Sequence, residues 1–156
     1  MIREYTMEEL FSREEFAGLV AEYSAECKNA GLVEPSPDKE LYCSMYEIGV
    51  ARVLGAEHKG LLVGFAVVLA HRVAHYSAPI AVIESLFVSR DYRASGLGWR
   101  MVKQIEALAA ALGVMGLFIT APRGSVLEAS LHRSASGYEN TNTVFFKQVK
   151  GGDALH

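Results

Sequence analysis

The sequence predicts an α/β domain of the α+β kind, with a mostly antiparallel central sheet flanked by about four helices. Three observations lead to this prediction. The 156 residues are a usual length for one domain, apolar residues recur at helical spacing in some segments and at strand spacing in others, and these segments follow one another in the order β-α-α-β-β-β-α-β-α-β. We therefore expect one domain over residues 1–150, with a loose tail over 151–156.

The N-terminal part is predicted to form a short strand, residues 2–6, and then an amphipathic helix. Thr6 with Glu9, and Ser12 with Glu15, each match the capping box that starts a helix. Apolar side chains then recur at the spacing of one helix face, up to about residue 28: Phe16, Leu19, Val20, Tyr23 and Cys27. Whichever box is used, one helix should run through this region with its apolar stripe toward the core.

A second helix and an antiparallel pair of strands come next. Ser36 and Pro37 suit the N-cap and the first turn of a helix, which should fade near Gly55. Residues 61–75 are rich in strand formers, and a turn then leads to a second strand over residues 80–88. The short connection predicts that these two strands pair as a hairpin.

The remaining elements alternate between helix and strand. An apolar stripe predicts a helix over residues 97–112, and an apolar run predicts a buried strand over 115–121. Ser125 can cap a helix that lasts to about residue 134, and residues 143–149 are predicted to form a final strand.

Composition argues against several classes of function. The formal net charge is −3, so nothing in the chain as a whole favours a nucleic acid or an anionic membrane as partner. The longest apolar run, residues 61–70, is too short to span a bilayer, and the acidic N-terminus does not resemble a signal peptide.

Cys27 and Cys43 lack metal-binding spacing, which favours reduced thiols and a cytoplasmic protein. His71 and His75 would lie about 13 Å apart along a strand, so we expect no metal site.

One segment predicts a local anion site in spite of the acidic chain. A strand ends and a helix begins within a few residues, so several N–H groups at the junction have no helical acceptor. Glycines let a phosphate approach the backbone, and the helix dipole favours an anion. The segment is Arg93, Ala94, Ser95, Gly96, Leu97 and Gly98, and the cations beside it are Arg90, Arg100 and Lys103. Its spacing matches neither the dinucleotide-binding G-x-G-x-x-G turn nor a P-loop.

The run LFVSRDYRASGLG, residues 86–98, resembles the strand-to-helix signature of the GNAT acetyltransferases, which is a valine and a Tyr-Arg turn followed by x-x-Gly-x-Gly. The order of elements resembles that family over nearly the whole chain. The resemblance implies acetyl-CoA as cosubstrate, with its pyrophosphate on residues 93–98 and its pantetheine arm along Leu86, Phe87 and Val88. It also implies that the Val88 N–H polarises the thioester carbonyl, and that a homodimer is possible.

The reaction of that family needs a base. An amine attacks a thioester only when it is unprotonated, so a group must accept its proton at neutral pH. Glu84 is the candidate, because it is a lone carboxylate in an apolar strand. Strand periodicity predicts that Glu84 shares a face with Leu86 and Val88. A structural salt bridge or a charge on a sheet edge is the alternative role for Glu84.

The residues that would supply an acid depart from the family pattern. Many members carry Asn-x-x-Ala-x-x-Leu-Tyr, whose Tyr serves as acid toward the leaving thiolate, but here Val126 and Arg133 stand where the Asn and the Tyr would be. Arg133 could stabilise negative charge. His132 and Tyr138 are substitute acids, although a helix-end cation and a core aromatic are simpler roles for them. Ser125, at the start of this helix, is expected to contact the cofactor.

We therefore expect an N-acetyltransferase that moves an acetyl group from acetyl-CoA directly to a primary amine. The alternative is a CoA-binding or partner-binding module that has lost catalysis, because the usual acid is missing. Substrate contacts in this family would come from residues 29–46 and 139–143, whose mixed chemistry indicates no class of amine.

Overall fold

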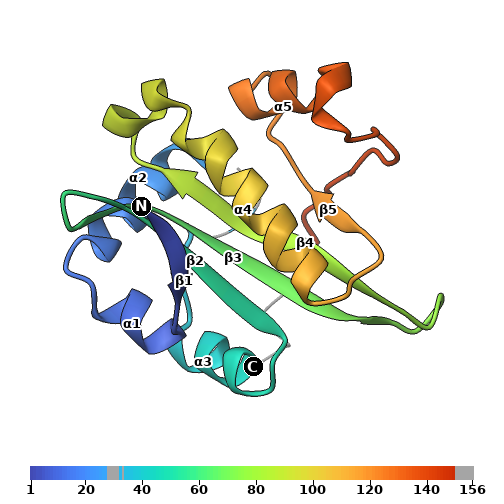
Figure 1. Ribbon diagram of the computed structural model, residues 1–156, viewed down its shortest axis with the longest axis horizontal. Helices are drawn as coiled ribbons and strands as arrows, with labels where there is room; N and C mark the ends of the chain where they lie inside the picture. Colours follow the sequence, from blue (N-terminus) through green and yellow to red (C-terminus); the bar gives the residue numbers. More distant parts are fainter. Residues whose placement is uncertain (28–31, 33, 150–156) are drawn as a thin grey trace.

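The computed structural model describes residues 1–27, 32 and 34–149, so the predicted tail at 151–156 lies outside the described residues. The elements are, in chain order, β1 (Ile2–Tyr5), α1 (Met7–Ser12), α2 (Phe16–Cys27), α3 (Lys39–Glu47), β2 (Ala51–His58), β3 (Leu61–Val73), β4 (Ala78–Val88), the 3₁₀-helix η1 (Arg90–Ser95), α4 (Leu97–Ala111), β5 (Leu117–Ile119), α5 (Val126–Leu131) and the 3₁₀-helix η2 (Ser134–Ser136). The strands form one sheet in the order β1-β2-β3-β4-β5 (Figure 1). All neighbours pair antiparallel except β4 and β5, which are parallel. The predicted fold class is confirmed, as is the β3–β4 hairpin.

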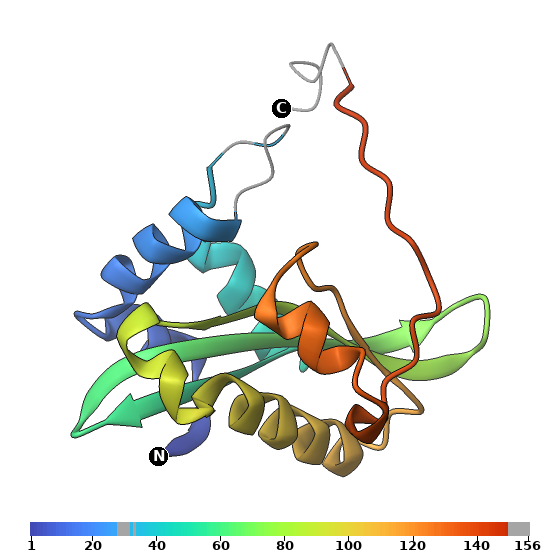
Figure 2. The same cartoon turned by 90° about the horizontal axis from the view of Figure 1, so that it is seen from above.

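Helices cover both faces of the sheet (Figure 2). On one face, α1, α2 and α3 pack around a buried cluster that includes Leu10 and Phe65. On the other face, Met101 and Ile105 of α4 are wholly buried against the sheet. The helix predicted over residues 97–112 is thus confirmed as α4, with its apolar stripe toward the core.

The predicted first helix is divided into two, α1 and α2. The Thr6 cap is confirmed, because its Oγ1 accepts a hydrogen bond from the Glu9 N–H at 3.0 Å. Ser12 does not cap a helix, since its hydroxyl donates to the Glu9 carbonyl. Between the helices Arg13 is extended, and its guanidinium donates to the Gly60 carbonyl at 2.6 Å in the β2–β3 turn. A contact with a distant hairpin therefore ends the helical run that periodicity alone had predicted.

The predicted second helix is shorter at both ends than expected. α3 begins after Asp38, whose carboxylate accepts from the Leu41 N–H at 3.0 Å, and not at Ser36. It ends at Glu47, so the prediction that it reaches Gly55 is wrong. The segment before Gly55 is β2, which lies between β1 and β3 and is largely buried. A strand that is buried on both faces does not alternate polar and apolar residues. Its sequence therefore cannot be distinguished by periodicity from that of a buried helix.

The C-terminal part also departs from the prediction. β5 has three residues, Leu117–Ile119, and its side chains are partly exposed, whereas a buried strand over 115–121 was expected. Ser125 caps α5 as predicted, but α5 ends at Leu131. Residues 143–149 form no strand in the described chain. The prediction of a last strand there is therefore wrong.

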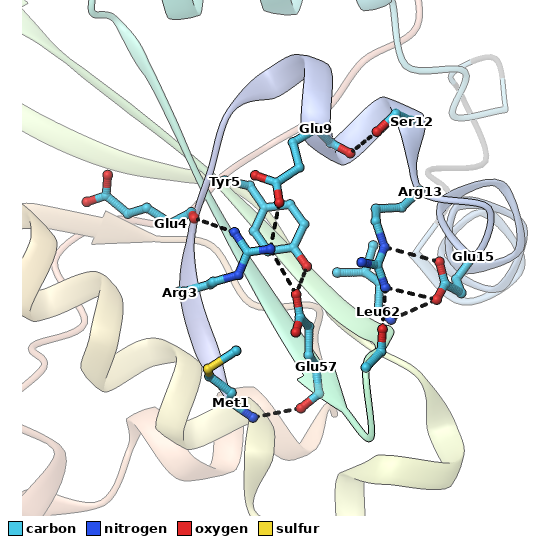
Figure 3. A network of polar contacts seen from close by, with 11 residues as sticks. Met1, Arg3, Glu4, Tyr5, Glu9, Ser12, Arg13, Glu15, Glu57 and Leu62 are labelled. Carbon is cyan, nitrogen blue, oxygen red and sulfur yellow. Dashed lines mark hydrogen bonds and ion pairs between the residues drawn. The ribbon is translucent and has the colours of Figure 1, made fainter.

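A network of hydrogen bonds and ion pairs surrounds Tyr5 at the β1 edge of the sheet (Figure 3). The Tyr5 hydroxyl donates to the Glu57 carboxylate, and Arg3 donates to Glu57 at 3.1 Å and to Glu9 at 2.6 Å. Burial and the bond to Glu57 raise the pKa of Tyr5 to about 12. The same bond, together with Arg3, lowers the pKa of Glu57. The ring of Tyr5 lies directly against Gly55, where a Cβ would overlap it.

Replacing Gly55 with alanine should destabilise the fold by about 1–3 kcal/mol, because the buried Tyr5 ring would have to leave its place and its bond to Glu57. The free energy of unfolding in urea measures this change. Gly18→Ala is the matched control: the same substitution in α2, with nothing within 4 Å of the new Cβ, should stabilise by roughly 0.5–1 kcal/mol. A Gly55→Ala protein as stable as the wild type would contradict the close packing.

Candidate active site

A β-bulge in β4 sets the position of Glu84. The β3–β4 register passes from Val68 opposite Ile83 to Val67 opposite Ser85, so Glu84 has no partner residue of its own. A bulge of this kind turns the following residues to the other face.

The bulge corrects the predicted face of Glu84. Glu84 and Ser85 line a cavity on the α1–α3 side of the sheet, while Leu86 and Val88 pack on the α4 side. The prediction that Glu84 shares a face with Leu86 and Val88 is therefore wrong.

The Glu84 side chain is exposed and accepts a hydrogen bond from the Tyr42 hydroxyl of α3 at 2.7 Å. No described cation forms an ion pair with it. Burial, followed by the bond to Glu84, raises the pKa of Tyr42, so the hydroxyl stays protonated and donates at neutral pH. Tyr42 was missed from the sequence because it is 42 residues from Glu84 and no local pattern connects the two.

The cavity beside Glu84 has a volume of about 350 Å³ and lies between the sheet and helices α1–α3. Among the described residues that line it, few are polar, and two of these, Asp38 and Glu84, are carboxylates. Asp38 is already engaged as the cap of α3. The rest of the lining is largely apolar and includes Phe11, Val20, Leu41, Met45 and Leu69. Of the predicted substrate segments, residues 34–46 contribute to this lining, residues 29–31 and 33 lie outside the described residues, and residues 139–143 are exposed.

The other side of β4 has an open edge at its C-terminal end. Pairing with β5 stops at Ile83 opposite Ile119, so residues 84–88 extend beyond the β4–β5 ladder. The Ser89 N–H donates to Val63 across the sheet. Because N–H groups alternate in direction along a strand, the Val88 N–H points away from β3 and toward this open edge. The side chains of Phe87 and Val88 are buried.

The predicted anion turn joins this edge to α4. It contains η1 and then Gly96, which has φ +71°, so a left-handed residue stands between the two helices. α4 follows with fifteen residues, and its first N–H groups have no acceptor within the helix. Ala94 and Ser95 are exposed, and the Ser95 hydroxyl donates to the Tyr92 carbonyl at 2.9 Å.

Two arginines of the turn are held by α2. Arg90 and Arg93 both form ion pairs with Glu26, at 2.8 and 2.7 Å, and these cations lower the pKa of Glu26. Arg93 also donates from Nε to the Val88 carbonyl at 2.8 Å. Their charge is therefore partly neutralised, whereas the Arg100 guanidinium makes no hydrogen bond or ion pair with a described residue.

The candidate acids do not gather around Glu84. Arg133 is exposed, and His132 lies 4.0 Å from a Glu128 oxygen. The Tyr138 hydroxyl is buried, and no described residue lies in hydrogen-bonding geometry to it. Burial and the charge of Glu106 on α4 raise the pKa of Tyr138, which keeps it protonated on the opposite side of the sheet from Glu84.

Ser125 has a structural role in this chain. Its hydroxyl accepts from the Glu128 N–H at 3.1 Å, and the Glu128 carboxylate in turn accepts from the Gly124 N–H at 2.5 Å. A contact between Ser125 and a cofactor stays a prediction.

Within the described ranges, no helix is long and apolar enough to cross a membrane.

Comparison with known proteins places this arrangement in one family. The sequence model of the Acetyltransferase (GNAT) family matches residues 7–128. The aminoglycoside N(6′)-acetyltransferase type 1 of Acinetobacter genomosp. 13 is 29% identical over 75 residues, which are 48% of this chain and 51% of that protein. The match thus spans about half the length of this curated relative.

Solved structures share the fold at low identity. A sisomicin-bound aminoglycoside acetyltransferase from an uncultured soil metagenomic sample has a TM-score of 0.73 and 20% identity, with 96% of each chain covered. A ribosomal-protein-alanine N-acetyltransferase from Brucella melitensis biovar Abortus 2308 gives 0.67 and 19%, covering 94% of this chain and 99% of the other. The glucosamine-6-phosphate N-acetyltransferase of Arabidopsis thaliana gives 0.71 and 15%, covering 94% and 96%. The names of these three proteins state three different acceptors. The likeness therefore indicates a shared fold and no particular substrate. Because the family model covers most of the sequence, the chain belongs to the acetyltransferase (GNAT) family.

Proposed function

We propose that this protein transfers an acetyl group from acetyl-CoA to a primary amine by direct attack. The observation that carries the proposal is the open edge of β4 at residues 84–88, which begins at Glu84 and leads along the chain to the turn that starts α4. Membership of the family supports acetyl transfer, and acetyl-CoA is the cosubstrate general to that family.

The residues at this edge fit the groups of acetyl-CoA. The first N–H groups of α4, the Gly96 turn and Arg100 would hold the pyrophosphate, because they supply donors and positive charge at one place. The backbone of residues 86–88 would hold the pantetheine arm along the open edge. When bound, acetyl-CoA supplies an activated acyl group, and the Val88 N–H would donate to the oxygen on which negative charge develops.

Glu84 would act as the base for the acceptor. An alkylammonium has a pKa near 10.4, so the amine must lose a proton before its nitrogen can attack. The Glu84 carboxylate takes that proton, directly or through a water, while the Tyr42 hydroxyl fixes the carboxylate in place. An N–C bond then forms and the C–S bond breaks. The nitrogen loses its second proton as the C–S bond breaks, and the departing thiolate takes that proton up, while the first proton leaves Glu84 for solvent. The thiolate is a tolerable leaving group because a thiol has a pKa near 8.5.

The cavity favours an acceptor with an apolar portion close to its amine. Apart from Glu84, the one carboxylate among the described lining residues is the capping Asp38, so a polycationic sugar would find few partners there. Phe11, Val20 and Leu69 instead offer apolar contact. This chemistry differs from what the aminoglycoside acetyltransferases among the relatives would need.

The test is amine-dependent release of free thiol from acetyl-CoA. The acceptor panel contains phenethylamine, a short peptide with a free N-terminus, and sisomicin. We expect turnover with at least one acceptor, and a higher kcat/KM for phenethylamine than for sisomicin. Tight acetyl-CoA binding without turnover on any amine would contradict the proposal and favour a CoA-binding module that has lost catalysis.

A further inference from the structure

The helix α2 contacts the predicted anion turn through two carboxylates that lie about one helical turn apart. Glu22 accepts hydrogen bonds from the Ser89 hydroxyl at 3.0 Å and from the Arg90 N–H at 3.3 Å. Glu26 accepts from the guanidinium groups of Arg90 at 2.8 Å and of Arg93 at 2.7 Å. The two carboxylates therefore have different partners, because Glu22 binds neutral donors and Glu26 binds two cations.

The contacts of Glu26 can be exchanged more easily than those of Glu22. Ser89 is buried, so its hydroxyl needs the bond to Glu22. The side chains of Arg90 and Arg93 are 75% and 41% exposed, and exposed ion pairs add little to folding stability because water solvates the separated charges. A cavity of about 300 Å³ lies beside Glu26 and Arg90. These side chains can therefore separate without a shift of the backbone.

Both arginines belong to the turn on which the pyrophosphate of acetyl-CoA is proposed to lie. They are three residues apart in the 3₁₀-helix η1, and this spacing places them on one side of it. The site continues directly from them, because the Gly96 N–H donates to the Arg93 carbonyl at 3.1 Å. A pyrophosphate carries more negative charge than one carboxylate, and guanidinium groups bind phosphate oxygens in pairs. Glu26 and the cofactor would consequently compete for the same two cations.

We propose, on the basis of the function proposed above, that Glu26 is a counterion which acetyl-CoA displaces. Before the cofactor binds, the Glu26 carboxylate holds Arg90 and Arg93; on binding, both guanidinium groups move from Glu26 to the pyrophosphate. Glu26 keeps the arginines close to the site, but its displacement lowers the affinity of the protein for acetyl-CoA. The product CoA carries the same pyrophosphate, so Glu26 also favours product release, which limits the turnover of many enzymes.

Calorimetric titration of Glu26→Gln with acetyl-CoA and with CoA tests this role. Glutamine keeps the size of the side chain but has no charge with which to hold the arginines. Both dissociation constants should fall by about tenfold, whereas a purely structural role of Glu26 predicts weaker binding. The free energy of unfolding in urea should change little, because the ion pairs are exposed. Glu47→Gln, which replaces an exposed carboxylate at the end of α3, is the matched control and should bind like the wild type.

A double-mutant cycle with Arg90→Gln separates displacement from a general effect of charge. Because one of the two cations is then absent, the gain from Glu26→Gln should fall from about tenfold to about threefold. The same gain in both backgrounds would overturn the proposal, because Glu26 would then act on the cofactor through space. A Glu26→Gln protein that binds acetyl-CoA no more tightly than the wild type would also overturn it and would leave the proposed function intact. A wild type that binds no acetyl-CoA would remove the proposed function and the role of Glu26 together.

Discussion

Replacing Glu84 with glutamine should lower amine-dependent thiol release at neutral pH by about 100-fold or more, which is the usual contribution of a general base. Glutamine keeps the size of the side chain and can still contact the Tyr42 hydroxyl, but it cannot take a proton from the amine. Acetyl-CoA affinity should stay close to that of the wild type, because Glu84 lies on the α1–α3 side of the sheet and the proposed cofactor edge is on β4 beyond it. Steady-state kinetics and equilibrium binding of acetyl-CoA measure the two quantities.

The pH profile separates a base from a structural role. Without Glu84, the rate should follow the small fraction of unprotonated amine in solution, and so rise about tenfold per pH unit below the pKa of the amine. The wild-type rate should rise less steeply. Glu14→Gln, an exposed carboxylate in the α1–α2 connection, is the matched control and should retain full activity. A Glu84→Gln enzyme with the wild-type rate at pH 7 would remove Glu84 from the mechanism.

The elements that the sequence predicted well are those with local signals. The Thr6 cap depends on two residues three apart, and the apolar stripe of α4 depends on spacing within one helix. The β3–β4 hairpin depends on a short turn between two apolar segments. In each case the residues that determine the structure are neighbours in the chain, so one sequence suffices to find them.

The errors arise where distant segments decide the local structure. Arg13 ends α1 because it binds the turn of a hairpin 47 residues away. The bulge at Glu84 is a property of the β3–β4 register, which strand periodicity cannot reveal. The segment at 143–149 has the composition of a strand, but a strand also needs an edge to pair with, and in this structure the segment pairs with no strand of the described chain.

The candidate site shows the same division. The turn at Gly96 and the carboxylate of Glu84 were visible as residue types in a pattern. Their partners were not: Glu26 binds Arg93 across 67 residues, and Tyr42 binds Glu84 across 42. These partners alter the chemistry, since Glu26 offsets cationic charge near the anion turn and Tyr42 adds a donor to the base.

Gly96→Glu should weaken acetyl-CoA binding by about tenfold or more, because a carboxylate would stand at the start of α4 where the pyrophosphate is proposed to lie. The substitution also strains the backbone, since φ at Gly96 is +71° and a left-handed residue with a side chain costs about 1–2 kcal/mol. Gly113→Glu is the control for that strain. Gly113 has the same φ of +71° and open space around its Cβ, but it follows the C-terminal end of α4. Calorimetric titration with acetyl-CoA should therefore show a loss of affinity in Gly96→Glu alone, while urea unfolding shows a similar loss of stability in both. Equal affinities in the two variants would mean that the pyrophosphate binds elsewhere, and the N-terminus of α4 would then have no part in holding the cofactor.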